Sequence, residues 1–228
     1  MPNHETIYAQ NAETYELLVS RQPSLAPHIE AIRPFDGLDV VDLGAGTGRL
    51  ATVLAPKAKS LVLLDASQAM LNVAADKLRR TGAAAWRTAV ADHRSLPLAD
   101  RSADLIAAGW TICYLTNDGV PDWETNVSRI IGEMERVLRP GGTIVIFETM
   151  GTGAETPCAP GFLRPYYSLL TETYRFSHKT VRLDYAFDSV RQAEELAGFF
   201  FGADMAERVR ANRWSRVPEW AGMWWKHV

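Results

Sequence analysis

A segment that changes from apolar residues to alternating glycines is the feature that most constrains the fold of this chain. Residues 40–51 read VVDLGAGTGRLA, with glycines at positions 44, 46 and 48. Glycine accepts positive φ values and lets a ligand approach the backbone closely. The segment therefore predicts a buried strand over 38–42, a tight turn and a helix over 48–55, with a nucleotide-like ligand held at the turn.

Strand-like and helix-like segments alternate after this turn. Amphipathic helices are expected over 67–82 and 123–138, where apolar residues recur three or four positions apart. Further strands are expected at the residues 60–65, 84–92 (ending near Ala91), 103–110 and 143–149. Strands separated by helices form βαβ units with right-handed crossovers, so the pattern predicts a parallel sheet.

The residues that follow the strands are the candidates for a ligand site. In an open α/β sheet, ligands bind beside the carboxyl ends of the strands. The residues at these ends are 42–48, Asp65, Asp92 with His93, Gly109 with Trp110, and Glu148 onward. A carboxylate at the end of the second strand is able to accept hydrogen bonds from two ribose hydroxyls.

The glycine turn does not match the dinucleotide pattern G-x-G-x-x-G. Counted from Gly44, that pattern requires a glycine at position 49, where the chain has Arg49. The mismatch disfavours a nicotinamide-dependent oxidoreductase. The start of the following helix favours a carboxylate as well as a phosphate, so the turn suits any adenosyl ligand.

Four motifs in order resemble class I S-adenosylmethionine-dependent methyltransferases. They are VVDLGAGTGRLA, LVLLDASQAML, VADHRSLPLADRSADLI and RVLRPGGTIVIFE, and the resemblance spans residues 38–148. It implies an α/β fold, namely a Rossmann-like three-layer sandwich with a mostly parallel seven-stranded sheet and an antiparallel C-terminal strand. It also implies methyl transfer from S-adenosylmethionine to an acceptor by in-line displacement.

The resemblance also assigns parts of the cofactor to residues. It implies that Gly44, Gly46 and Gly48 line the methionyl part, that Asp42 lies near the amino group, that Asp65 holds the ribose and that Asp92 faces the adenine amine. His93 is expected to contact the cofactor through its backbone. The segment YAQNAETYELL resembles the part of relatives that closes over the cofactor, which makes Tyr8 and Tyr15 candidates for a lid. The predicted cofactor-binding residues are Tyr8, Tyr15, Asp42, Gly44, Ala45, Gly46, Gly48, Asp65, Ala66, Asp92, His93, Gly109 and Trp110.

Each of these assignments has a purely structural alternative. The glycines also suit an ordinary connection from a strand to a helix, and Asp65 also suits a cap for the helix that begins near Ser67. Asp92 also suits a solvated turn. The spacing of Tyr8 and Tyr15 also suits a helix that buries two rings.

The whole chain is expected to form a single domain with four parts. Residues 1–35 form a helical lid, 36–148 the cofactor-binding core, 149–187 a substrate-cap insertion, and 188–228 C-terminal helices with closing strands. The last of these includes a hairpin over 213–228, whose four tryptophans are expected to pack in the core or at an edge.

The acceptor is expected to lie against the cap insertion. The start of that insertion is rich in Gly, Pro and Thr, as is typical of irregular loops. A pocket for a small organic acceptor is predicted from Trp110, Tyr166, Tyr167, Tyr174 and His178. His178 is the first candidate for a general base and His93 the second, although a histidine beside Ser177 and Lys179 also suits the surface.

Charge and cysteine content disfavour several other classes. The chain has 24 basic and 27 acidic residues, a net charge of −3, and no basic stripe for nucleic acid. Two cysteines without metal-ligand spacing favour a reduced, cytoplasmic protein without a metal site, and Cys113 is expected to be buried packing. No segment approaches the roughly 18 apolar residues of a membrane helix. The aromatic tail leaves a homodimer open, and an S-adenosylmethionine-binding module without transfer stays open as an alternative function.

Overall fold

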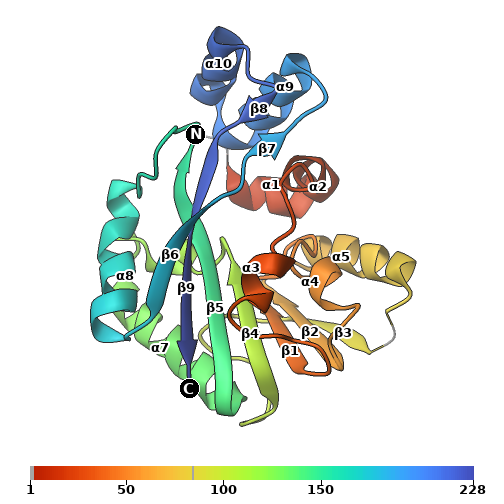
Figure 1. Ribbon diagram of the computed structural model, residues 1–228, viewed down its shortest axis with the longest axis vertical. Coiled ribbons are helices and arrows are strands. Elements are labelled where there is room, and N and C mark those ends of the chain that lie inside the picture. Colours follow the sequence, from red (N-terminus) through yellow and green to blue (C-terminus); the bar gives the residue numbers. More distant parts are fainter. Residues whose placement is uncertain (1–2, 84) are drawn as a thin grey trace.

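Seven strands form one sheet at the centre of the protein (Figure 1). The computed structural model describes residues 3–83 and 85–228, so Ala84 of the predicted third strand and residues 1–2 of the predicted lid lie outside the described residues. The strand order is β3-β2-β1-β4-β5-β9-β6, and only β9 runs antiparallel to its neighbours β5 and β6. This confirms the predicted sheet. The strands are β1 (Asp39–Leu43), β2 (Ser60–Asp65), β3 (Trp86–Val90), β4 (Ala103–Gly109), β5 (Leu138–Thr152), β6 (Ser177–Arg182) and β9 (Glu219–His227).

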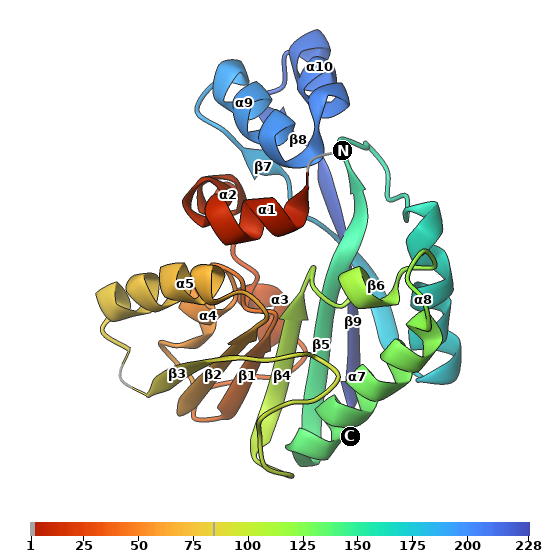
Figure 2. The same cartoon turned by 180° about the vertical axis from the view of Figure 1, so that it is seen from behind.

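Helices cover both faces of the sheet and make it the middle of three layers (Figure 2). One face carries α3 (Ala26–Glu30), α4 (Ala51–Leu54) and α5 (Gln68–Thr81), and the other carries α6 (Cys113–Thr116), α7 (Trp123–Val137) and α8 (Arg164–Ser168). Local signals set the ends of α5, because the Ser67 side chain accepts from the Met70 amide and Gly82 ends the helix in a left-handed conformation. The helices predicted over 67–82 and 123–138 are therefore confirmed, whereas the helix predicted over 48–55 is shortened to α4.

Two N-terminal helices lie above the carboxyl ends of the first strands (Figure 1). They are α1 (His4–Gln10) and α2 (Ala12–Val19), and they meet at Asn11. The Ser67 hydroxyl donates to the Tyr8 carbonyl over 3.3 Å and ties α1 to the start of α5. The first two helices thus stand where a lid over the glycine turn is expected.

A small cap rises beyond the same edge of the sheet, between β6 and β9 in sequence. It consists of β7 (Tyr185–Ala186), α9 (Val190–Phe201), α10 (Ala203–Asn212) and β8 (Arg216–Val217), and β7 pairs with β8. It has an apolar cluster of its own, to which Leu18 of α2 contributes. The cap and the N-terminal helices therefore pack together.

The predicted cap insertion over 149–187 is wrong for most of its length. Residues 161–182 form the 3₁₀ turn η1 (Gly161–Leu163), α8, the π-helical turn η2 (Leu169–Thr173) and β6, all parts of the central domain. Tyr166 is fully buried, and the ring of Tyr167 lies 4.5 Å from that of Trp224 in the core. The alternating aromatic and polar residues belong to helix turns that pack one side on the sheet.

The predicted hairpin over 213–228 is also wrong. Its two halves pair with distant segments: β8 joins β7, and β9 lies between β5 and β6. Pro218 separates the two strands. The expectation that the tryptophans pack internally is confirmed for Trp214, Trp224 and Trp225, each of which belongs to or packs on an apolar cluster.

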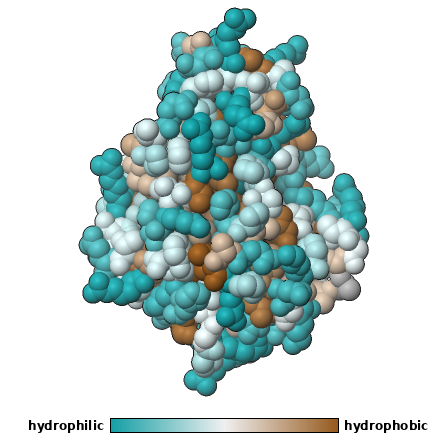
Figure 3. All heavy atoms as spheres, in the orientation of Figure 1, coloured by the Kyte–Doolittle hydropathy of each residue, from teal (hydrophilic) through white to brown (hydrophobic). Residues whose placement is uncertain are grey.

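Hydrophilic residues cover most of the face drawn in Figure 3, and the apolar ones appear in small separate areas. Within the described ranges, no helix is both long enough and apolar enough to cross a membrane.

Candidate functional site

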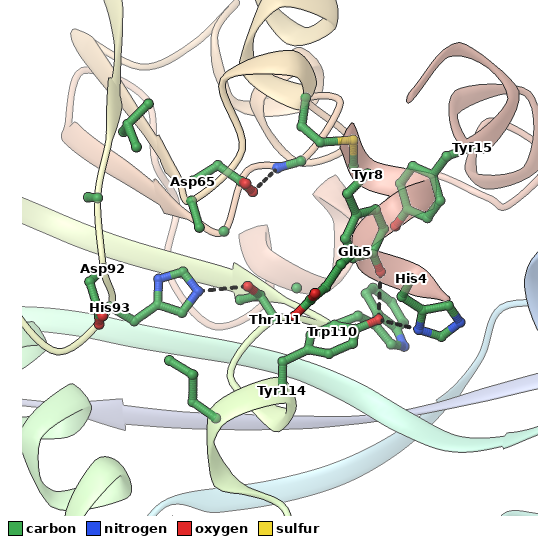
Figure 4. Close-up of a pocket in the computed structure, with 18 residues that line it drawn as sticks. His4, Glu5, Tyr8, Tyr15, Asp65, Asp92, His93, Trp110, Thr111 and Tyr114 are labelled. Atoms are coloured by element: carbon green, nitrogen blue, oxygen red, sulfur yellow. Dashed lines mark hydrogen bonds between the residues drawn. The ribbon is translucent and has the colours of Figure 1, made fainter. Parts of the chain in front are cut away.

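A pocket of about 580 Å³ lies between the carboxyl ends of β1 to β4 and the helices α1, α2 and α6 (Figure 4). Every strand end from the first to the fourth contributes to its wall, as predicted for a parallel sheet. The lining residues are His4, Glu5, Tyr8, Tyr15, Gly44, Gly46, Asp65, Ala66, Met70, Val90, Ala91, Asp92, His93, Gly109, Trp110, Thr111, Tyr114 and Leu115.

The glycines of the turn after β1 have different tasks. A Cβ on Gly44 would overlap the Thr111 side chain, so the loop after β4 packs directly on this backbone. Gly46 lines the pocket, and its amide donates to Asp65 over 2.8 Å. Gly48, with φ +84°, faces Ala74 of α5 and lines neither the pocket nor the small cavity beside it. The prediction that Gly48 lines a ligand is corrected, because this glycine lets α5 approach the turn.

A small cavity of about 30 Å³ adjoins the pocket below the glycine turn, and Asp42 and Ala45 line it. Asp42 is fully buried. The backbone amide of Ala51 lies near its carboxyl group, but neither carboxylate oxygen has a hydrogen bond of normal geometry. Burial raises the pKa of Asp42 to about 8. A buried acceptor without a partner costs on the order of 1–3 kcal/mol, so this carboxyl group is suited to a ligand that donates hydrogen bonds.

Arg49 brings a positive charge to the same cavity. Its guanidinium carbon lies 4.1 Å from the ring centre of Trp110, and its buried Nη2 has no partner. Burial lowers the pKa of Arg49. Trp110 itself has a positive φ of 52°, which costs energy in a residue other than glycine and is common at functional sites. The cavity thus offers an unpaired acid and an incompletely paired guanidinium.

Asp65 is fixed at the end of β2 by two backbone amides. One oxygen accepts from Gly46 and the other from Ser67, each over 2.8 Å. Each carboxylate oxygen keeps a second lone pair, and the side chain lines the pocket (Figure 4). Asp65 therefore both supports the turn and stays able to accept from a ligand.

Asp92 and His93 both line the pocket, and each side chain also has a partner within the protein. Arg94 donates to both oxygens of Asp92, over 2.9 and 2.6 Å, and these hydrogen bonds lower the pKa of Asp92 to about 2. His93 was expected to contact a ligand through its backbone, but its buried side chain lines the pocket. Its Nε2 lies 2.8 Å from the Thr111 hydroxyl. Burial lowers the pKa of His93, so its imidazole is neutral at pH 7.

The two candidate lid tyrosines both line the pocket and also pack on each other. Tyr8 of α1 and Tyr15 of α2 have ring centres 5.4 Å apart at an angle of 86°. Burial raises the pKa of Tyr15 to about 12 and that of Tyr8 further, so both phenols are neutral. The packing and lid interpretations therefore describe the same arrangement.

The predicted aromatic acceptor pocket is not formed. Of its members only Trp110 lines the pocket. Tyr166 and Tyr167 are buried in the apolar cluster between the sheet and the helices α7 and α8. His178 is exposed on the edge strand β6, where its ring stacks on Trp224 at 4.4 Å. This placement contradicts the prediction of a general base at His178 and agrees with the alternative of a surface histidine.

Several pocket residues were missed by the sequence reasoning. Thr111, Tyr114 and Leu115 directly follow β4, so the strand-end rule extended by a few residues would have included them. His4 precedes Tyr8 by one helical turn, a spacing that places both side chains on one face of α1. Arg49 was used only to reject a dinucleotide.

Cysteine and metal chemistry contribute little to this site. Burial raises the pKa of the Cys113 thiol, and the Cys113 amide donates to Glu148. The thiol is therefore poorly suited to act as a nucleophile. Within residues 3–83 and 85–228, no group of three or more His, Cys, Asp or Glu side chains is placed to hold a metal ion.

Comparison with known proteins identifies similar chains. The family model described as a methyltransferase domain matches residues 41–146. The malonyl-[acyl-carrier protein] O-methyltransferase of Marinomonas sp. is 28% identical over 186 residues, which are 80% of this chain and 62% of that protein. The ubiquinone/menaquinone biosynthesis C-methyltransferase of Bordetella parapertussis is 31% identical over 135 residues, 58% of this chain and 47% of that protein. The chain thus spans less than two thirds of the length of these curated relatives.

A solved structure supports the same fold. The YcgJ protein of Bacillus subtilis superimposes with a TM-score of 0.58 at 16% sequence identity, and the match covers 90% of this chain and 97% of that one. The central sheet and the two helix layers are therefore those of a known architecture.

Proposed function

We propose that the chain, whose residues 41–146 match the methyltransferase-domain family model, transfers a methyl group from S-adenosylmethionine to a small organic acceptor. The observation that carries this proposal is the pair of unsatisfied groups, one acidic and one basic, in the cavity beside the glycine turn. Asp42 has two oxygens without a partner, and Arg49 has a buried nitrogen without one.

The amino-acid end of S-adenosylmethionine fits the chemistry of this pair. Its ammonium group donates hydrogen bonds, as the acid at position 42 requires, and its carboxylate accepts them from a guanidinium. Asp65 is in a position to accept from the ribose hydroxyls. The adenine would lie near Val90, Ala91 and His93 at the end of β3, and a contact of its amine with Asp92 would compete with Arg94.

The cofactor supplies a methyl group that its sulfonium already activates. The protein's own task is then to hold the acceptor in line with that methyl group and to exclude water. The helices α1 and α2 are suited to this task because His4, Glu5, Tyr8 and Tyr15 close one side of the pocket.

The acceptor is proposed to be a small molecule that meets Trp110, Thr111, Tyr114 and Leu115 beside the lid. A pocket of about 580 Å³ is within the usual range for sites that bind a cofactor or a drug-sized ligand. The net charge of −3 argues against a nucleic-acid acceptor. The relatives named above modify oxygen and carbon atoms, so similarity does not choose the acceptor atom.

Calorimetry tests the cofactor. Titration with S-adenosylmethionine, S-adenosylhomocysteine and NADH is expected to give binding of the first two. Binding of NADH alone would reject the proposal. Incubation with methyl-labelled cofactor and a metabolite extract, followed by mass spectrometry, then tests transfer. Tight cofactor binding without any labelled product would favour a binding module over an enzyme.

Compartment and assembly complete the proposal. We propose the cytoplasm as the compartment, and the free thiols of Cys113 and Cys158 support this proposal because disulfides are rare in reducing compartments. A homodimer through the aromatic C-terminal strand stays a prediction. Size-exclusion chromatography with light scattering measures it directly, and a mass of one chain, 25.3 kDa, would reject it.

A further inference from the structure

We propose that His4, Tyr114 and Tyr8 form a directed hydrogen-bond relay that removes a proton from the methyl acceptor, with His4 as the terminal base. The inference rests on the proposed methyl transfer. It assigns a proton acceptor to a pocket for which the sequence offered only His178 and His93.

Three side chains from two elements meet at the lid side of the pocket (Figure 4). The hydroxyls of Tyr8 and Tyr114 lie 2.5 Å apart, and the Tyr114 hydroxyl lies 3.3 Å from Nδ1 of His4. Nε2 of His4 lies 3.1 Å from the backbone carbonyl oxygen of Phe200. His4 and Tyr8 belong to α1, and Tyr114 belongs to α6.

The partner of Nε2 fixes the direction of the whole relay. A carbonyl oxygen only accepts, so Nε2 of His4 carries the proton, and in the neutral ring Nδ1 is left as the acceptor. Tyr114 must therefore donate to Nδ1, and its oxygen in turn accepts from the Tyr8 hydroxyl. The Tyr8 oxygen is the entrance, because its remaining lone pair is available to a hydrogen bond from a ligand in the pocket.

The surroundings hold His4 in place and keep the phenols neutral. The His4 ring stacks on Phe200 of α9 at 4.4 Å and 1°. Burial raises the pKa of Tyr8, and a phenol is neutral at pH 7 even in water, so both hydroxyls pass a proton on rather than hold a negative charge. Other titratable groups near the relay are Glu5 of α1, Tyr15 of α2, Cys113 of α6 and Glu148 of β5.

Proton transfer along the relay balances without any further reactant. The acceptor's proton moves to the Tyr8 oxygen as the Tyr8 proton moves to Tyr114 and the Tyr114 proton moves to Nδ1 of His4. The electron pair of the broken bond stays on the acceptor atom, which becomes the nucleophile, and His4 becomes an imidazolium that returns the proton to water. Such a device serves an acceptor whose reacting atom carries a proton at neutral pH, such as an alcohol or a phenol, and not a carboxylate.

Nitrogen-15 spectra of histidine-labelled protein test the direction of the relay without any acceptor. The His4 signals are identified by their loss in His4→Gln. We expect the neutral ring to carry its proton on Nε2, and the Nδ1 signal to move in Tyr114→Phe, which keeps the ring but interrupts the relay. A His4 protonated on Nδ1, or an Nδ1 signal unaffected by Tyr114→Phe, would overturn the proposal.

Transfer of labelled methyl groups to a metabolite extract tests the relay in action. His4→Gln and Tyr114→Phe are expected to slow transfer at neutral pH by about 10²-fold, the lower end of the range for general base catalysis. His28→Gln, a matched change on α3 outside the pocket, is expected to leave the transfer rate unchanged.

Binding of S-adenosylhomocysteine by each variant separates the two levels of the argument. Retained binding with slowed transfer is the expected result. If the wild-type chain binds no cofactor, the proposed function is rejected. Normal transfer rates in both variants would reject the relay alone.

Discussion

At the scale of single residues, the buried carboxyl group of Asp42 makes the stability of the protein depend on pH. Its pKa is raised by burial from 3.8 to about 8, so between these values the folded protein without ligand binds a proton that the unfolded chain releases. The free energy of unfolding therefore falls as the pH rises through this window, by up to about 1.4 kcal/mol per pH unit from this group.

Asp42→Asn is expected to remove this dependence. The variant should gain stability relative to the wild type as the pH rises from about 5 to 8, which urea unfolding at several pH values measures. Glu148 and Glu219, whose pKa values burial raises to about 7, are the same in both proteins and cancel in the difference. A difference in unfolding free energy that does not change with pH would contradict the assignment.

Arg49 and Asp65 are expected to recognise different parts of the cofactor. Arg49→Met should weaken binding of S-adenosylhomocysteine by about 1.5–3 kcal/mol, the range for hydrogen bonds to charged groups. It should leave binding of 5′-methylthioadenosine, which lacks the amino-acid end, nearly unchanged. Asp65→Ala should weaken both ligands by a similar amount. Calorimetry with the four combinations decides, and equal losses for both ligands in Arg49→Met would contradict the proposed contact.

At the scale of elements, Gly48 sets the distance between the glycine turn and α5. A Cβ at this position would lie 3.0 Å from that of Ala74, and the φ of +84° already disfavours any other residue. Gly48→Ala is therefore expected to destabilise the protein by strain and by displacing α5.

Gly82→Ala is the matched control for this effect. Gly82 has a similar φ of +73°, but a Cβ there would meet nothing within 4 Å. Urea unfolding should show Gly48→Ala to be less stable than Gly82→Ala by about 1–3 kcal/mol, the usual cost of overpacking. Equal stabilities would mean that α5 shifts without cost.

Elements whose signals are local were predictable, and those that depend on distant partners were not. The strands β1, β2 and β4 and the helices α5 and α7 follow from apolar periodicity and capping residues within each segment. β9 is rich in aromatic residues, as the wall of a ligand pocket would also be. Only its pairing with β5 and β6, which are distant in the sequence, shows that its rings pack inside the protein. The segment between β6 and β9 forms β7, α9, α10 and β8. It contains no local sequence signal that distinguishes a cap from closing strands.

The same difference between local signals and distant contacts applies to the residues of the site. Strand ends located most of the predicted binding residues, because the carboxyl ends of parallel strands share one edge. Arg49 and the group formed by His4, Tyr8 and Tyr114 depend on how α1, α6 and the turn meet in space. His178 was chosen for its residue type alone, and the register of β6 with β9 places it on the surface beside Trp224.

At the scale of the whole molecule, the lid and the cap meet at Phe200. The ring of this residue stacks on His4 and lies 5.2 Å from that of Tyr15, so α9 supports both helices that close the pocket. The lid and the strand ends line the pocket. The cap is therefore expected to influence the pocket through the contacts of Phe200 with the lid. Order in the lid should therefore depend on α9.

Phe200→Ala is expected to loosen the lid while the central sheet stays intact. Loss of the aromatic contacts should cost about 0.5–1.5 kcal/mol for each pair and speed amide hydrogen exchange in α1 and α2. Binding of S-adenosylhomocysteine should weaken as a result, because the ligand must then order the lid. Phe201→Ala is the control, since Phe201 packs on Tyr185 and on the Phe200 ring within the cap but makes no aromatic contact with His4 or Tyr15. Hydrogen exchange that changes equally in α1 for both variants, or only in the sheet, would show that the cap does not hold the lid.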